Sequence, residues 1–394
     1  MTPGVPSLPV ADPSKMTPDY ADLRACLASY LEAGVSSLRA FGSGWETTIY
    51  EFAIDSRSSR VPGLPIRSPL VLRVYQGATA DDKAAREGRT MFRVAAAGYP
   101  VPRPYLLERD TVALGSPFLI MDRVAGGPLF VTKSLPQAFT TFSLGFIAFV
   151  RAQVRLHRLA VGDDDGGIKD GPGASAPAPS TASEDAKQAQ SPNARNTSSP
   201  PGTAPLLDRL LDVVADRIAC GPLPGLSDAL AILRDRAARY RIAPSVNVHM
   251  DYHPQNVLVR GMRVTGVVDW VSADRGDRHL DAATTSAILA TSAMDHPRWM
   301  RDNPAGNSLR RLFAMLYFPA YHALAPMQLD RFRYCQAVAA LYRLSTLGMM
   351  RTRGPESVGY RPAAIANVTP DVLRLLSRYA TRKSGTPVNI DTAI

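Results

Sequence analysis

Residues 249–256 read His-Met-Asp-Tyr-His-Pro-Gln-Asn, and residues 267–270 read Val-Val-Asp-Trp. The stretch between these two motifs predicts a compact β-hairpin with a Gly-Met turn. A short antiparallel hairpin brings its two outer ends side by side. We therefore expect Asn256 and Asp269 to lie next to each other, with Asp251 close by in the loop before the hairpin.

Asn256 offers an amide oxygen, and Asp251 and Asp269 each offer a carboxylate, which suit a hard cation. Mg²⁺ prefers oxygen ligands, and it needs few of them from the protein where phosphates and water complete its shell. Phosphoryl transfer needs in-line positioning, charge neutralisation and a carboxylate that orients the acceptor hydroxyl. The motifs therefore favour a phosphoryl-transfer site in which Asn256 and Asp269 can reach one metal ion.

These motifs resemble the catalytic and metal loops of the aminoglycoside phosphotransferase/choline kinase-like family, a branch of the protein-kinase-like superfamily. The usual His-Gly-Asp-x-x-x-x-Asn of that family corresponds to residues 249–256, with Met250 in place of the glycine. Its apolar-Asp-Trp loop corresponds to residues 267–270. The stretch 276–281, Gly-Asp-Arg-His-Leu-Asp, is similar to the family's Gly-Asp-Pro-x-x-Asp. The resemblance covers about residues 37–290.

The resemblance implies a role for each residue of the two loops. Asp251 would be the catalytic base, or the carboxylate that orients the acceptor hydroxyl. Asn256 and Asp269 would hold Mg²⁺, His249 would brace the catalytic loop, and Asp281 would hydrogen-bond the loop backbone. The implied cofactors are ATP and Mg²⁺, and the implied substrate is a small molecule that carries a hydroxyl group.

A glycine-containing segment precedes the predicted strand at residues 49–54 and reads Phe-Gly-Ser-Gly-Trp-Glu from residue 41. Glycines let a backbone approach a phosphate closely. Kinases of the protein-kinase-like superfamily, which this sequence resembles, have their phosphate-covering loop at this point of the chain. We therefore expect Gly42, Ser43 and Gly44 to contact the nucleotide.

Four further residues are expected to complete the nucleotide site. Arg73, in a predicted strand, occupies the place of the lysine that contacts the phosphates in protein kinases. Arginine keeps the positive charge and can bind phosphate through two nitrogens. Glu87, on the following predicted helix, is its expected partner. Asp122 and Val124, at the end of another predicted strand, are the expected hinge at which adenine meets the backbone.

The whole pattern predicts an α+β, bilobal, protein-kinase-like fold. We expect a small β-rich lobe over residues 17–127 and a large, mostly helical lobe over residues 128–385. The proline-rich residues 1–16 and the tail 386–394 are expected to be flexible. A disordered insertion is expected at residues 161–205, where 27 of 45 residues are Gly, Pro, Ser or Ala. Such a segment can bury too little apolar surface to offset the entropy lost on ordering.

Within the lobes, strands are predicted over 49–54, 70–75 and 117–124, and helices over 81–97, 135–159, 206–218, 227–240, 308–322, 329–350 and 370–382. No run approaches the roughly 18 apolar residues that a membrane span needs, so no membrane insertion is expected. Three widely spaced cysteines form no metal or disulfide pattern, and no secretory signal is evident. We expect a reduced, cytoplasmic compartment.

The net charge of +10 is concentrated near the C-terminus. Residues 298–383 contain thirteen arginines and one lysine against four acidic residues. This excess fits a solvated surface, and it also fits an anionic acceptor or partner. The region lacks the signatures of nucleic-acid-binding modules, so no nucleic-acid partner is expected. Because polycationic aminoglycosides usually need acidic pockets, we expect a neutral or anionic acceptor.

A metal-dependent hydrolase is one alternative function. His249, Asp251 and His253 are spaced i, i+2, i+4, and together with Asp269 they could bind zinc or a dinuclear pair if they lay on a strand. Pro254 favours a loop at this point instead. This alternative also leaves the glycine-containing segment without a role.

A catalytically impaired, kinase-like nucleotide-binding protein is a second alternative. The departures at Met250 and Arg73 favour it, whereas the intact base and metal positions oppose it. A protein kinase fits less well, because Asp281 comes only twelve positions after Asp269. That length leaves no room for a long activation segment.

Overall fold

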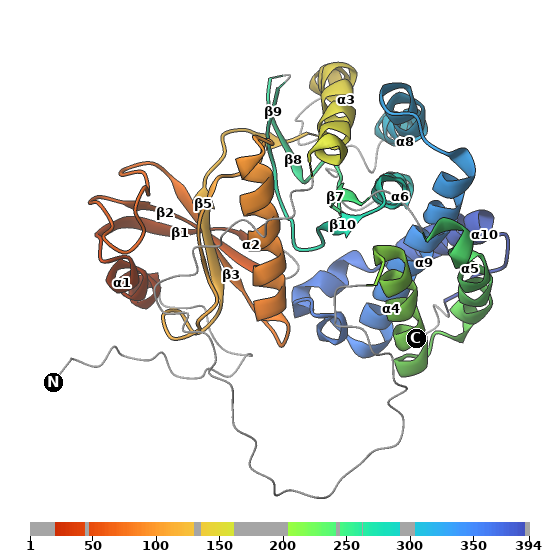
Figure 1. Ribbon diagram of the computed structural model, residues 1–394, viewed down its shortest axis with the longest axis horizontal. Coiled ribbons are helices and arrows are strands. Elements are labelled where there is room, and N and C mark those ends of the chain that lie inside the picture. The colour runs from red at the N-terminus through yellow and green to blue at the C-terminus, as the bar shows by residue number, and fades with distance from the viewer. Residues whose placement is uncertain are drawn as a thin grey trace, which may run out of the picture.

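The computed structural model describes residues 20–43, 47–129, 135–160, 204–241, 245–261, 263–291 and 304–390. A β-rich N-terminal lobe and a helical C-terminal lobe lie side by side, which confirms the predicted α+β, bilobal class (Figure 1). The expected flexible N-terminus, residues 1–16, lies outside the described residues, as does nearly all of the expected insertion at 161–205.

The N-terminal lobe contains α1 (Tyr20–Leu31), β1 (Val35–Ser43), β2 (Thr47–Ile54), β3 (Leu70–Tyr75), α2 (Ala80–Ala96), β4 (Pro104–Glu108) and β5 (Phe118–Asp122). Its five strands form one antiparallel sheet in the order β1-β2-β3-β5-β4. Helices α1 and α2 lie on opposite faces of this sheet (Figure 1). The sheet therefore has a separate apolar core on each side.

Strand β3 lies at the centre of the sheet, and all six of its residues are buried. Leu70 and Leu72 pack into the core that contains α1, whereas Val71 and Tyr75 belong to the core that continues into the helical lobe. Successive side chains of a strand point to opposite faces. Arg73 lies between Val71 and Tyr75 in this alternation and therefore points toward the helical lobe.

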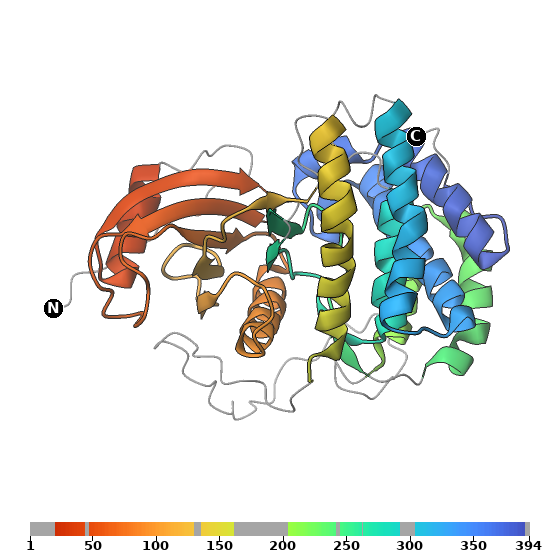
Figure 2. The same ribbon diagram turned by 90° about the horizontal axis from the view of Figure 1, so that it is seen from above.

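The C-terminal lobe contains β6 (Gly127–Pro128), α3 (Leu135–Arg158), α4 (Leu206–Cys220), α5 (Ser227–Tyr240), β7 (Val246–Val248), β8 (Val257–Arg260), β9 (Arg263–Val267), β10 (Asp274–Gly276), α6 (Arg278–Thr291), α8 (Pro304–Leu324), α9 (Leu329–Arg353) and α10 (Pro370–Ser384). Short 3-10 turns span Pro224–Leu226, Pro355–Val358 and Pro362–Asn367. Helices α3 and α8 run side by side (Figure 2), and α9 packs against α4, α6 and α10. Strands β6, β8 and β9 form a small sheet at the boundary between the lobes.

Two strands of the N-terminal sheet were not predicted from the sequence. β1 and β4 are its edge strands, and most residues of β1 after Val35 are exposed or only half-buried. For β1, this weak apolar cover leaves little alternation of polar and apolar residues in the sequence. β4 differs, because four of its five residues are buried, and the proline at its start, Pro104, masks the strand pattern. Within the tail expected to be flexible, Val388, only 1% exposed, and Ile390 are buried in the core of the helical lobe. Packing therefore extends to residue 390.

The described residues contain three free thiols, at Cys26, Cys220 and Cys335. Among these same residues no helix combines the length and the apolar character that crossing a membrane requires. Cys335 is buried in α9, and burial raises the pKa of its thiol well above the ordinary value.

Gly126, where the chain passes from one lobe to the other, should not tolerate a side chain. Its φ is +127°, and a Cβ atom would lie 2.7 Å from the backbone oxygen of Val259 and 2.8 Å from the Thr265 hydroxyl. We expect Gly126→Ala to lower the free energy of unfolding by about 1–3 kcal/mol, measured by denaturant titration. Gly127→Ala is the matched control, since its Cβ would meet no atom within 4 Å. Equal losses in both variants would contradict this account.

Candidate active site

The predicted hairpin forms and brings three polar residues together. Val257 in β8 pairs with Val267 in β9, and the Val268 N–H donates to the Asn256 backbone oxygen at 2.9 Å. The Asn256 Nδ2 donates to the backbone oxygen of Asp251 at 2.9 Å and lies 3.3 Å from its Oδ2. Asp251, Asn256 and the chain entering Asp269 therefore meet at one end of the hairpin.

Arg73 approaches this cluster from the other lobe. Its Nη2 donates to Asp269 Oδ1 at 2.6 Å, and its Nε lies 3.1 Å from Glu87 Oε2. The Arg73 side chain is almost fully buried, whereas the Asp269 side chain is 39% exposed. Asp269 has a φ of +66°, a conformation that aspartate adopts more readily than most residues. The carboxylate thus faces both the arginine and open space.

Glu87 is fully buried on the apolar stripe of α2, where only its partners can balance its charge. Its carboxylate accepts hydrogen bonds from the Tyr75 hydroxyl at 2.5 Å and from the Trp270 N–H at 3.1 Å. Burial raises the pKa of Glu87, and the charge of Arg73 opposes that shift. For Arg73, burial favours the neutral form, but Glu87 and Asp269 keep its pKa above the ordinary value.

Glu87→Gln should destabilise the fold strongly. Without the Glu87 charge, the buried guanidinium of Arg73 keeps only the partly exposed carboxylate of Asp269 to balance it, and we expect a loss of about 3 kcal/mol in the free energy of unfolding. Asp81→Asn is the matched control, because Asp81 also lies on α2 and pairs with Arg109 at the exposed surface. That variant should lose about 1 kcal/mol or less. Chemical denaturation measures both, and comparable losses would contradict the prediction.

His249 is fully buried and holds the catalytic loop against the hairpin. Its Nε2 donates to the Val268 backbone oxygen at 3.0 Å, and its Nδ1 accepts from the Asp251 N–H at 3.3 Å. Burial lowers the pKa of His249, which matches this neutral ring with one donor and one acceptor. Both ring nitrogens are engaged by the backbone, which argues against the metal-dependent hydrolase. The His249 ring therefore ties the loop that carries Asp251 to the end of strand β9.

The residue that replaces the family glycine has a left-handed backbone. Met250 has a φ of +62°, which glycine adopts without strain and methionine does not. Its N–H donates to Asp281 Oδ1 at 2.6 Å, and its side chain packs against the main core. Buried Asp281 is in turn held by His157 Nε2 at 2.8 Å and by Gln153 Nε2 at 3.0 Å. Asp281 thus bonds the loop backbone, as the resemblance implies.

The Asp251 carboxylate, 32% exposed, is faced by two basic side chains. His253 Nε2 lies 3.5 Å from its Oδ2, and Arg343 Nη1 in α9 lies 3.9 Å from its Oδ1. Burial alone would raise the pKa of Asp251, but His253 and Arg343 hold it well below its usual range. Asp251 is therefore ionised at neutral pH. Sequence reasoning missed Arg343, whose only signal was the basic composition of its region.

A family model described as the phosphotransferase enzyme family matches residues 37–327, most of the chain. The chain belongs to this family. No curated protein sequence matches it. In fold it is similar to aminoglycoside phosphotransferase APH(4)-Ia, with 15% identity, a TM-score of 0.54 and coverage of 94% of this chain and 99% of that one.

Two solved complexes of thermostable APH(4)-Ia mutants are similar in the same way. One is a ternary complex with AMP-PNP and hygromycin B, with 15% identity, a TM-score of 0.54 and coverage of 92% of this chain and 98% of that one. The other is a ternary complex with ADP and hygromycin B, with 14% identity, a TM-score of 0.51 and coverage of 92% and 97%. At this level of identity the likeness concerns the fold.

The other described residues of this phosphotransferase-family chain that we expect to contact a nucleotide lie in β1, in β5 and just after β5. Gly42 and Ser43 end strand β1 opposite Ile49 and Thr48, and Gly44 lies outside the described residues. Asp122 ends β5, and its carboxylate accepts from the Tyr105 hydroxyl at 2.7 Å. A Cβ at Gly266 in β9 would lie 3.1 Å from a methyl of Val124, so the expected hinge around Val124 lies against the hairpin. Their contact with a nucleotide stays a prediction.

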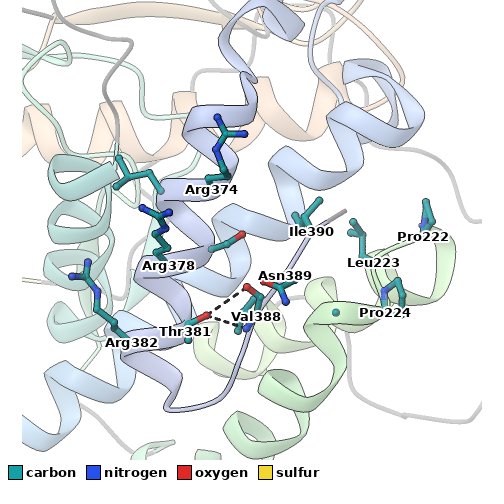
Figure 3. Close-up of a pocket in the computed structure, with 13 residues that line it drawn as sticks. Pro222, Leu223, Pro224, Arg374, Arg378, Thr381, Arg382, Val388, Asn389 and Ile390 are labelled. Atoms are coloured by element: carbon teal, nitrogen blue, oxygen red, sulfur yellow. Dashed lines mark hydrogen bonds between the residues drawn. The ribbon is translucent and has the colours of Figure 1, made fainter. Parts of the chain in front are cut away.

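Part of the basic C-terminal region lines a different site. A groove of about 920 Å³ lies between α10 and residues 222–225 (Figure 3). Arg374, Arg378 and Arg382 line it and lie on one face of α10, as their four-residue spacing requires. Among the described residues, those that line this groove include none of the predicted site residues. The regional charge excess alone therefore says little about the catalytic loop.

Proposed function

We propose that this chain is an ATP-dependent phosphotransferase that transfers the γ-phosphoryl group to a hydroxyl of a small molecule. The observation that carries the proposal is the meeting of Asp251, Asn256 and Asp269 at one hairpin, with Arg73 opposite. Family membership supports phosphotransferase chemistry. The complex of a structural neighbour with AMP-PNP supports ATP as the donor.

Asn256 and Asp269 offer the donor set that Mg²⁺ requires. The Asn256 Nδ2 donates toward Asp251, which turns its amide oxygen the other way, and the Asp269 carboxylate is open to solvent. Both are hard oxygen ligands, which fit magnesium. When bound there, the ion would neutralise phosphate charge. Arg73 would bind a phosphate oxygen, and Glu87 would keep the guanidinium in place.

Asp251 would orient the acceptor. Its ionised carboxylate would accept a hydrogen bond from the acceptor hydroxyl and align the oxygen for in-line attack on the γ-phosphorus. The new O–P bond forms as the bond to ADP breaks, and the hydroxyl proton passes to Asp251. Because the pKa of Asp251 is low, the carboxylate would take this proton late in the transfer step. Its main role would be to orient the acceptor hydroxyl.

The helical lobe favours a small acceptor over a peptide. Helix α6 begins at Arg278, nine residues after Asp269. A short segment of this kind provides no extended platform on which a polypeptide could lie. We further propose a neutral or anionic acceptor in preference to a polycationic aminoglycoside, because Arg343 and His253 face the Asp251 carboxylate.

A coupled ADP-release screen across hydroxylated metabolites and antibiotics tests this function. We expect ATP-dependent phosphorylation of at least one small alcohol, with loss of product in the Asp251→Asn variant. Absence of ATP binding in calorimetry would contradict the proposal itself. A resistance phenotype restricted to aminoglycosides on expression of the chain would instead overturn only the acceptor preference.

A further inference from the structure

Arg343 reaches the proposed acceptor carboxylate from the helical lobe, whereas Arg73 belongs to the β-rich lobe. Its Nη1 lies 3.9 Å from Asp251 Oδ1. That separation exceeds the length of a hydrogen bond. The Arg343 side chain is 23% exposed and that of Asp251 is 32% exposed, so a solute can reach both.

The two oxygens of the Asp251 carboxylate have different neighbours. Oδ2 lies near the Asn256 amide and the His253 ring, whereas Oδ1 lies near Arg343. An acceptor hydroxyl bonded to Oδ1 would have its oxygen within about 7 Å of the Arg343 guanidinium, given a normal hydrogen-bond length. An anionic oxygen three or four bonds from that hydroxyl oxygen can then come within hydrogen-bonding distance of the guanidinium.

The helix that carries Arg343 is fixed in place at this point. The neighbouring Leu344 is fully buried. Arg217 of α4 donates to the Ser345 hydroxyl at 3.1 Å and to the Thr346 hydroxyl at 2.7 Å. Both hydroxyls lie in the same turn of α9 as Arg343. The backbone at Arg343 is therefore positioned before any ligand arrives, which reduces the entropy cost of binding.

We propose that Arg343 anchors an anionic group of the acceptor, so that the substrate class is a small alcohol carrying a carboxylate or a phosphate. This inference rests on the proposed function. A guanidinium binds either anion through two parallel hydrogen bonds, and it repels an ammonium group held a few ångströms away. The guanidinium that faces the Asp251 carboxylate thus selects acceptors by charge.

Matched acceptor sets test the anchor. Each set has a neutral polyol, its carboxylate, its phosphate ester and its amine, such as glycerol, glycerate, glycerol 3-phosphate and 3-aminopropane-1,2-diol, with parallel sets on four- and six-carbon chains. We expect kcat/KM for an anionic member to exceed the neutral one by about ten-fold or more, and the amine to be poorest. Comparison of glycerate with glycerol 3-phosphate identifies which anion is preferred.

Variants of Arg343 supply the second measurement. Arg343→Gln should remove the anionic advantage: the ratio of kcat/KM for an anionic member to kcat/KM for its neutral counterpart should fall by about ten-fold or more, mainly through the KM of the anionic member. Arg343→Lys should retain part of the advantage, because the charge remains. Arg351→Gln, an exposed position two turns along α9, is the matched control and should leave the preference intact.

Three outcomes would overturn the anchor. An equal loss of kcat with every acceptor would place Arg343 on the transferred phosphoryl group instead. A preference for the amine would reverse the charge argument. ATP hydrolysis that depends on Asp251 and Asp269, without turnover of any set, would exclude this acceptor class and leave the proposed function standing. If the wild-type chain neither binds nor hydrolyses ATP, the proposed function itself fails.

Discussion

Replacement of Asp269 by asparagine is expected to reduce ATP-dependent turnover by roughly a thousand-fold or more. The carboxylate is a proposed Mg²⁺ ligand, and an amide carries no charge to balance the cation. It also pairs with Arg73 at 2.6 Å, so its loss would loosen the guanidinium that we expect to bind phosphate. Steady-state assays at saturating ATP should show the fall in kcat, and a Mg²⁺ titration should show a higher half-saturating concentration.

A nearby carboxylate provides the control for this experiment. Asp274, five residues further along the chain, pairs with Arg209 at 2.9 Å at the surface of the helical lobe. Asp274→Asn should keep kcat within about three-fold of the wild type, since surface ion pairs contribute little. Thermal denaturation of both variants separates loss of chemistry from loss of fold. An Asp269→Asn enzyme with more than a tenth of the activity and unchanged Mg²⁺ dependence would remove Asp269 from the metal site.

The hairpin could be predicted from the sequence because its geometry is local. Two strands joined by a tight turn have only one way to bring their ends together. The neighbouring positions of Asn256 and Asp269 followed from spacing alone. The pairing of Arg73 with Glu87 required more, because it joins a strand to the next helix, and there the family pattern supplied what spacing could not.

Other parts of the site depend on contacts that no local pattern records. Arg343 is 92 residues from Asp251 along the chain and meets it only because α9 packs within the helical lobe. The contact between Arg73 and Asp269 joins the two lobes across 196 positions. Composition indicated a basic region, but it could not separate Arg343 from the arginines of α10 that line another groove. Only the tertiary structure distinguishes them.

The position of Met250 bears on the catalytically impaired alternative. Its positive φ explains why glycine suits this place in the family, and a methionine there stores about 1 kcal/mol or more of strain. Yet its N–H still bonds Asp281, and His249 still bonds the hairpin. The loop therefore keeps the hydrogen bonds that position Asp251, which favours an active enzyme over an impaired one.

Asp251→Asn should lower kcat by about 10²–10⁴-fold and change the KM for ATP by less than about three-fold. Asparagine has nearly the same shape, and the Asn256 amide can still donate to the backbone oxygen of residue 251, so the loop should keep its structure. What is lost is the negative charge that we propose aligns the acceptor hydroxyl and receives its proton. Initial rates over a grid of ATP and acceptor concentrations separate kcat from both KM values.

Slow hydrolysis of ATP by water offers an independent readout of the same variant. Water can take the place of the acceptor hydroxyl. A hydrolysis rate that falls in parallel with the transfer rate would therefore show that Asp251 acts on the attacking oxygen. Unchanged ADP affinity in calorimetry would show that the nucleotide side is intact. If the variant keeps transfer within ten-fold of the wild-type rate, the acceptor oxygen is oriented elsewhere. The proposal for Arg343 would then lose its support, because it assumes that the acceptor hydroxyl binds the Asp251 carboxylate, 3.9 Å from Arg343 Nη1.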